Sequence, residues 1–151
     1  MMAQAPLLTG QDIAEAQGAV TRVLEHALAE TGTNRYEYVV LRVLTVRGPF
    51  AAPRELHEFV AGQQQLGLTP EAVADVLGRL EAAGLAAGTA YDGAGPAEAT
   101  PAGAALLREL TEKVTPTTRD LFSGLDPDDL ATAHHVLIEV TERAGRILAS
   151  A

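Results

Sequence analysis

The chain has 151 residues, a length typical of one domain that can bury a full core. Hydrophobic residues make up 47% of it and aromatic residues only 4%, which favours a globular, mainly helical fold with a core of Ala, Leu and Val. The absence of Cys excludes disulfides and thiolate metal sites, and a net charge of −9 excludes a uniformly basic nucleic-acid binder.

The amino-terminal residues MMAQAPLLTGQD lack the basic region and the long apolar run of a signal peptide. No stretch approaches the roughly 20 consecutive apolar residues that span a bilayer. We therefore expect a cytoplasmic protein that has no membrane partner.

Two helices are predicted first. Residues 11–30 carry apolar side chains at a spacing of 3.6 residues, and Thr9 or Asp12 can cap the start of this helix. Asn34 is the predicted N-cap of a second helix over residues 35–47, which a Gly-Pro pair ends. The β-branched residues of this segment also permit a strand, but the neighbouring segments favour a helix.

A helix-turn-helix is predicted next. Pro53 suits the first turn of a third helix, and Thr69-Pro70-Glu71 begins a fourth, with a capping hydroxyl, a first-turn proline and an acid. Gly84 ends the fourth helix. The residues predicted to face inward are Leu56, Phe59, Val60, Val73, Val76, Leu77 and Leu80. His57 and Glu58 are predicted to be solvated.

Small residues dominate residues 85–101, LAAGTAYDGAGPAEATP, and predict two short strands around a turn at Asp92-Gly93. A long helix is predicted over residues 101–120, with Pro116 as a point of kinking or interruption. Its inward residues are predicted to be Ala105, Leu106, Leu110 and Val114. A last helix starts at Asp126-Pro127, with Leu130, Ala133, Leu137, Val140, Ile147 and Leu148 predicted inward.

Three segments resemble the MarR (multiple antibiotic resistance regulator) family. RLEAAGLA at 79–86 is similar to the end of that family's recognition helix running into the wing. ATPAGAALLREL at 99–110 is similar to the return strand of the wing entering the next helix, and LFSGLDPDDLATAHHVL at 121–137 to the turn and last helix. The resemblance covers about residues 11–148. It implies a mainly α fold in which a winged helix-turn-helix lobe with a small β-wing joins a helical dimerisation region formed by the N- and C-terminal helices.

The resemblance also implies one MarR-like domain over 1–151. Its winged-helix lobe would be residues 35–101, and residues 11–30 and 102–148 would be the dimerisation helices. The implied function is a ligand-responsive transcriptional regulator that binds double-stranded DNA as a homodimer, with the fourth helix in the major groove. The residues expected nearest the DNA are Arg54, Thr69, Glu71, Asp75 and Arg79.

The charge of this segment supports a second interpretation. Between Glu55 and Leu107 there are seven acidic residues and one basic residue, Arg79, so the segment has a net charge of −6 and should repel phosphate. The alternative is a winged-helix dimer that has lost DNA binding. Such a dimer would bind a small molecule in the cleft between lobe and dimer region, and catalysis on that molecule is one form of this alternative.

A small apolar or phenolic ligand is the partner that the resemblance implies for this cleft. The few aromatic residues and the nearby polar ones are candidate walls. The candidate ligand-binding residues are Arg22, His26, Tyr36, Tyr38, Arg42 and Phe59. Both tyrosines can instead be packing residues with satisfied hydroxyls.

No catalytic residue, metal ligand or cofactor is predicted. No nucleophile motif, phosphate loop or metal-ligand spacing occurs in the sequence. His134 and His135 are adjacent on the last predicted helix and point about 100° apart, so they cannot bind one metal ion together.

Overall fold

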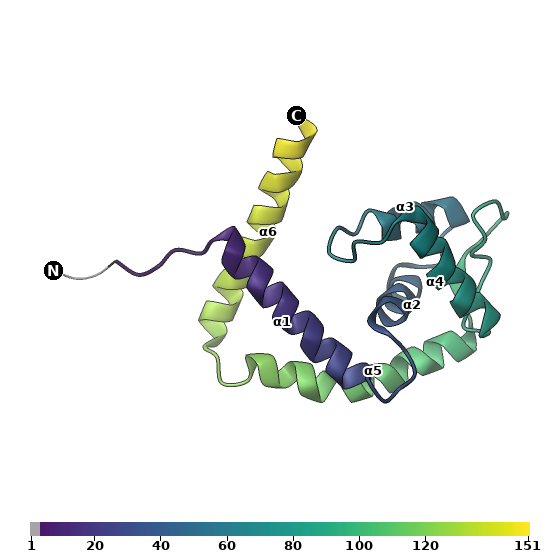
Figure 1. Cartoon of the computed structure of the whole chain (residues 1–151), viewed down its shortest axis with the longest axis horizontal. Helices are drawn as coiled ribbons and strands as arrows, with labels where there is room; N and C mark the ends of the chain where they lie inside the picture. Colours follow the sequence, from purple (N-terminus) through teal and green to yellow (C-terminus); the bar gives the residue numbers. More distant parts are fainter. Residues whose placement is uncertain (1–3) are drawn as a thin grey trace. The chain divides into compact units, whose positions relative to one another are not determined.

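The computed structural model describes residues 4–151, and this part contains six helices and one two-stranded sheet (Figure 1). The elements are α1 (Gly10–Leu28), α2 (Arg35–Arg47), α3 (Pro53–Ala61), α4 (Pro70–Ala82), β1 (Ala86–Ala87), β2 (Glu98–Ala99), α5 (Pro101–Phe122) and α6 (Pro127–Ala149). The chain divides into two compact units between Thr118 and Arg119, a boundary that lies within α5. The mainly α fold with a small β-wing is confirmed.

The predicted N-caps begin their helices. The Thr9 hydroxyl accepts the Asp12 N–H at 3.2 Å, while the Asp12 carboxylate accepts the Thr9 N–H at 2.9 Å. Both candidates for the start of α1 therefore act together as a capping box. The side chains of Asn34 and Thr69 each accept a backbone N–H three residues further on, at 2.9 and 3.1 Å, and so start α2 and α4.

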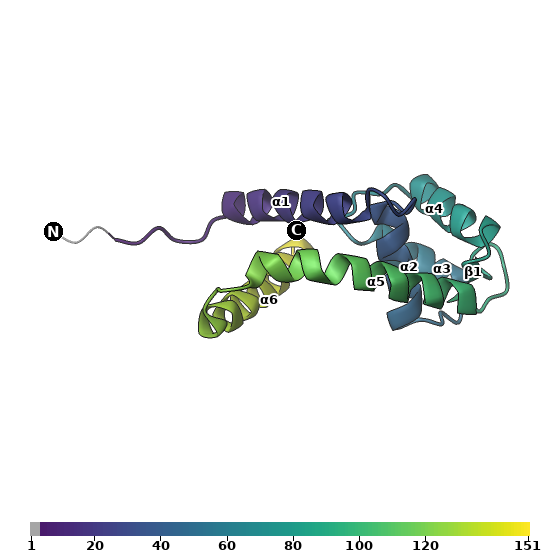
Figure 2. The same cartoon turned by 90° about the horizontal axis from the view of Figure 1, so that it is seen from below.

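Helix α2 is the central helix of the first unit, and Figure 1 shows it enclosed by α3, α4 and α5. Val40 and Leu44 pack into a cluster with α3 and α4. Tyr38 and Leu41 pack into a second cluster, with the carboxyl end of α1 and with α5. Figure 2 shows α1 and α5 meeting there. Burial on both sides explains why this segment is too apolar for a surface helix.

The inward positions predicted for the helix-turn-helix are largely confirmed. Leu56 and Val60 of α3 are buried, as are the four predicted residues of α4, and Phe59 is half-buried. Glu58 is exposed as expected, but the prediction for His57 is wrong because its exposed fraction is only 8%. The buried stripe of α3 is 53, 56, 57 and 60, the spacing of a helix face turned to the core.

The wing is an antiparallel pair in which Ala86 lies opposite Ala99 and Ala87 lies opposite Glu98. Phe50 extends it through an isolated bridge to Ala97. Gly88 has a φ of +71°, and a Cβ there would lie 2.1 Å from the Pro96 carbonyl oxygen. Only glycine fits this close approach of the two arms.

The predicted inward face of α5 is confirmed at Leu110 and Val114 and is wrong at Ala105. Its buried residues are Gly103, Leu107, Leu110 and Val114, whereas Leu106 is half-buried and Ala105 is exposed. Gly103 helps to decide which face of α5 is buried, because any Cβ at this position would lie 2.0 Å from the Leu85 carbonyl oxygen. Pro116 lies within α5 and does not interrupt it.

Helix α6 makes up most of the second unit. The Asp126 carboxylate caps it by accepting the Asp128 N–H at 2.8 Å. None of its residues is buried, and Leu137 and Leu148 are 44% and 74% exposed. Of the residues predicted to point inward, Leu130 is half-buried and the others are exposed, and the unit that contains α6 has no second long helix to cover them.

Among residues 4–151, no helix combines the length and the apolar character needed to cross a membrane.

Candidate functional site

The five predicted DNA-contacting residues lie in the helix-turn-helix, at the start of α3 and along α4. Thr69 is the N-cap of α4, and Glu71, Asp75 and Arg79 are exposed on that helix. The Arg54 guanidinium lies over the Tyr91 ring, 5.3 Å from its centroid. None of the five forms an ion pair within the described part of the chain. The charged groups of Arg54, Glu71, Asp75 and Arg79 are therefore available to a partner.

One acid of this region has a structural role. The Glu81 carboxylate accepts the Gly88 N–H at 3.1 Å and the Thr89 hydroxyl at 2.7 Å, so it ties the first arm of the wing to α4. The other acids of α3 and α4 are exposed on the same lobe as the two arginines. The surface that a winged helix would present to DNA is therefore acidic overall.

A buried histidine joins the wing to α3. His57 Nε2 donates to the carbonyl oxygen of Thr89 at 2.7 Å, because a carbonyl can only accept. Thr89 is itself 1% exposed. The Tyr91 ring meets the His57 ring edge to face, with 5.3 Å between centroids. These contacts hold the wing in a fixed position against α3.

Two adjoining cavities border Tyr91, and we refer to them together as the wing groove. The first has a volume of about 430 Å³ and is lined by His57, Glu58, Ala61, Pro70, Glu71, Ala74 and Tyr91. The second has a volume of about 380 Å³ and is lined by Ala52, Pro53, Arg54, Glu55, Glu58, Tyr91, Asp92 and Gly93. Glu58 and Tyr91 belong to both, so the groove runs from the start of α4 to the wing tip.

A third cavity, the interhelical pocket, lies between α1, α2 and α5 and has a volume of about 560 Å³. Its lining is Val20, Leu24, Tyr38, Arg42, Val46, Leu107, Thr111, Val114, Thr115 and Thr118. It combines apolar walls with a few polar groups, as small-molecule sites do. Of the six predicted ligand-binding residues, the structure brings Tyr38 and Arg42 together here.

Tyr38 lines this pocket from α2. The residue is 6% exposed, and no hydrogen bond joins its hydroxyl to another described residue. Every buried polar side-chain atom of the described part has a hydrogen-bond partner. Since the Tyr38 hydroxyl has none, it is accessible to solvent. Arg42 is exposed beside it and forms no ion pair with a described residue. A phenolic hydroxyl and a guanidinium thus share one largely apolar cavity.

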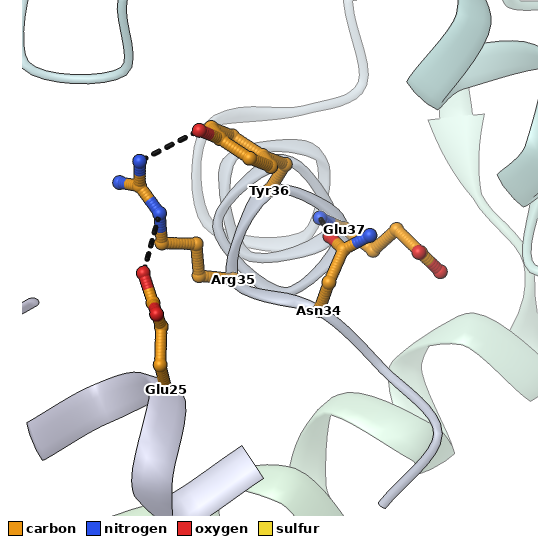
Figure 3. A network of polar contacts seen from close by, with 5 residues as sticks. All are labelled: Glu25, Asn34, Arg35, Tyr36 and Glu37. Atoms are coloured by element: carbon orange, nitrogen blue, oxygen red, sulfur yellow. Dashed lines mark hydrogen bonds and ion pairs between the residues drawn. The ribbon is translucent and has the colours of Figure 1, made fainter. Parts of the chain in front are cut away.

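The other four ligand candidates lie elsewhere. Arg22 and His26 are exposed on α1 and do not line the pocket. Tyr36 accepts a hydrogen bond from the Arg35 guanidinium at 2.6 Å, and Arg35 also pairs with Glu25 of α1 at 3.1 Å (Figure 3). Phe59 packs beside Phe50, with ring centroids 6.1 Å apart.

Sequence reasoning missed several groups of these sites. His57 was detectable, because it falls on the buried stripe of α3 at helical spacing. Tyr91 and the three threonines of α5 carry no local signal, since only the packing of separate elements brings them to a cavity. Within residues 4–151, no group of three His, Asp or Glu side chains is placed to hold a metal ion.

No family model matches the chain, and no curated protein matches it. Solved structures do. The Mycobacterium tuberculosis MarR family protein Rv2887 in complex with DNA is 28% identical, with a TM-score of 0.64 over 91% of this chain and 98% of that one. The same protein with salicylic acid is 24% identical (TM-score 0.63, 89% and 99% covered), and wild-type MarR from E. coli is 20% identical (TM-score 0.65, 89% and 98% covered).

The helix-turn-helix followed by a two-stranded wing defines a winged-helix protein. The similarity to these solved structures extends over nearly their whole length, so it defines the fold more narrowly than the winged helix alone does. The chain has the fold of the MarR family.

Proposed function

We propose that this chain is a MarR-like transcriptional regulator that binds double-stranded DNA as a homodimer and responds to a small molecule. The observation that carries the proposal is the similarity, over nearly the whole chain, to Rv2887 solved with DNA. In this proposal residues 1–151 form one cytoplasmic domain, with the lobe at 35–101 and dimerisation helices at 11–30 and 102–148.

The uncovered face of α6 supports the dimer. Leu137, Ile138 and Val140 are each 42–45% exposed, and Leu148 is 74% exposed. An apolar face of this extent is costly in water and is relieved when a second helix covers it. Sedimentation should therefore give twice the chain mass. A monomer at micromolar concentration would contradict this part of the proposal.

DNA contact is assigned to α4 and the start of α3, where Arg54 and Arg79 are exposed cations without an ion pair to a described residue. A gel-shift titration against the gene's own upstream region at about 50 mM salt should give a specific complex, because low salt favours phosphate contacts. Arg79→Ala should weaken this complex. Arg108→Ala, an exposed arginine on α5, should not.

The interhelical pocket is the proposed ligand site. Rv2887 has been solved with salicylic acid, a small phenolic anion. In this chain the Arg42 guanidinium would pair with the carboxylate of such a ligand, and the Tyr38 hydroxyl would hydrogen-bond to it. Salicylate should raise the melting temperature of the wild type. Arg42→Ala should lose that shift, while Arg22→Ala, outside the pocket, should retain it.

A second candidate is a winged-helix dimer that binds the small molecule but not DNA. The observation that favours it is the net charge of −6 between Glu55 and Leu107. The same two assays separate the candidates. A salicylate-induced thermal shift without any DNA complex at about 50 mM salt would favour this second function, because electrostatic affinity is greatest at low salt.

A further inference from the structure

We propose that the wing groove binds an arginine side chain from a basic segment of a partner protein. This goes beyond the regulator function, because it gives the helix-turn-helix face a protein ligand. The proposal rests on three features of the groove: the charged side chains of its first cavity are both carboxylates, its floor is apolar, and acids outnumber the one cation, Arg54, in its second cavity.

The histidine is the most specific of the acceptors. His57 is 8% exposed and uses its Nε2–H on Thr89, and no described residue forms a hydrogen bond with Nδ1. Every buried polar side-chain atom of the described part has a hydrogen-bond partner. Since Nδ1 has none, it is accessible to solvent. The cavity that His57 lines is the first part of the groove. In the neutral ring Nδ1 is an acceptor, and a donor on the occupant can bond to it in place of water.

The other polar groups of this cavity also favour a hydrogen-bond donor or a cation. Glu58 and Glu71 are exposed carboxylates on its rim, and the face of the Tyr91 ring attracts cations. The helix end beside them offers few donors. Pro70 has no N–H, and the Ala72 N–H is already bonded to the Thr69 hydroxyl at 3.1 Å. A guanidinium, with five N–H donors and no acceptor, matches this set.

The apolar part of the cavity fits the rest of an arginine side chain. Ala61, Pro70 and Ala74 line it without contributing a polar side chain. Arginine buries its methylene stem along such a surface while its charged head reaches polar groups. The chain shows the same contact internally, because Arg54 already places its guanidinium 5.3 Å from the Tyr91 centroid on the second part of the groove.

The length of the groove favours a protein segment over a lone small cation. Glu55 and Asp92 line the second cavity, so carboxylates continue beyond the first one toward the wing tip. Glu55, Glu58 and Asp92 outnumber Arg54 in that cavity, so further positive charges of a segment would still meet an excess of acid there. Nucleic acid is the opposite case, since its phosphates would face the same carboxylates.

The test is fluorescence anisotropy with fluorescein-labelled hexa-arginine and the full chain in about 150 mM salt, where nonspecific attraction is screened. The double variant Glu58→Gln/Glu71→Gln should weaken binding at least tenfold. The matched control Glu109→Gln/Glu112→Gln removes the same charge from exposed positions of α5 and should change affinity less than twofold. Equal weakening in both, or no binding by the wild type, would overturn the proposal.

A second pair of variants tests the cavity itself. Ala74→Leu fills the floor from an exposed helical position and should weaken the peptide at least fivefold. Ala82→Leu, exposed on the same helix but outside the groove, should leave the affinity unchanged. A hexa-citrulline peptide, which keeps the shape and loses the charge, should not bind. Retained binding of Ala74→Leu, or binding of the citrulline peptide, would contradict the assignment.

DNA binding separates this proposal from the regulator function. Glu58→Gln alone changes a groove residue that is not among those expected to contact DNA, and it removes a charge that repels phosphate. Its DNA affinity should be unchanged or increased while its peptide affinity falls. If the chain binds the peptide as described but never DNA, the regulator proposal fails and the groove assignment stands. If it binds DNA but not the peptide, the groove assignment fails alone.

Discussion

Replacing Gly103 with alanine sets two opposing effects against each other. Alanine is the better helix former, by up to about 1 kcal/mol in a helix interior. At this position, however, the new Cβ would lie 2.0 Å from the Leu85 carbonyl oxygen and 3.2 Å from Leu41 Cδ1. The carbonyl is not free to move, because it accepts the Thr100 N–H at 3.1 Å.

The magnitude follows from these contacts. Overpacking of a buried site costs about 1–3 kcal/mol, and loss of the hydrogen bond to Leu85 adds about 0.5–1.5 kcal/mol. Together they exceed the gain in helix propensity, so Gly103→Ala should lower the free energy of unfolding by about 1–3 kcal/mol. A loss of about 2 kcal/mol corresponds to roughly 4–8 °C in melting temperature for a chain of this size.

Gly78→Ala is the matched control. Gly78 is exposed in α4, and no heavy atom lies within 4 Å of the position that a Cβ would take, so only the propensity gain of up to about 1 kcal/mol remains. Urea unfolding of both variants at one protein concentration, which keeps dimer linkage constant, measures the difference. The reasoning fails if Gly103→Ala is as stable as the wild type, because α5 then cannot lie so close to Leu85.

Four further outcomes are expected. Thr89→Val removes a buried hydroxyl's bond to Glu81 at 2.7 Å and should cost about 0.5–2 kcal/mol in urea unfolding; an unchanged stability would mean that the wing is not anchored there. Tyr38→Phe should leave stability within about 0.5 kcal/mol but weaken salicylate severalfold by calorimetry, and equal affinity would remove this hydroxyl from the site. Leu137→Glu should convert the dimer to monomer in sedimentation, whereas a persistent dimer would place the interface elsewhere. With Arg54 and Arg79 from each of two lobes on phosphate, DNA affinity should fall roughly a hundredfold between about 50 and 200 mM salt, and a loss of about 10⁴ would require cations not assigned above.

Element boundaries were largely predictable because their signals are local. A side chain that caps a helix bonds to a backbone N–H three residues away, so Asn34 and Thr69 indicate the starts of α2 and α4 without reference to the rest of the chain. The four buried residues of α4 follow from helical spacing in the same way. The family resemblance then supplied the order of the elements and the position of the wing.

The site was less predictable because it depends on which elements meet. Tyr38 and Arg42 were identified from α2, but Arg22 and His26 share a helix with pocket residues and still point to solvent. His57 shows that even a local signal was misread, since a titratable residue on a buried stripe can be satisfied by a distant carbonyl such as that of Thr89.

Neighbouring residues and composition were enough to locate the helix boundaries, to predict a core of Leu, Val and Ala, and to reveal the excess acid of the helix-turn-helix. The packed structure was needed to learn that Gly103 brings α5 close to Leu85, that His57 bonds to Thr89 of the wing, and that His57 and carboxylates line one groove. These features arise from contacts between residues far apart in the chain, which no local spacing encodes.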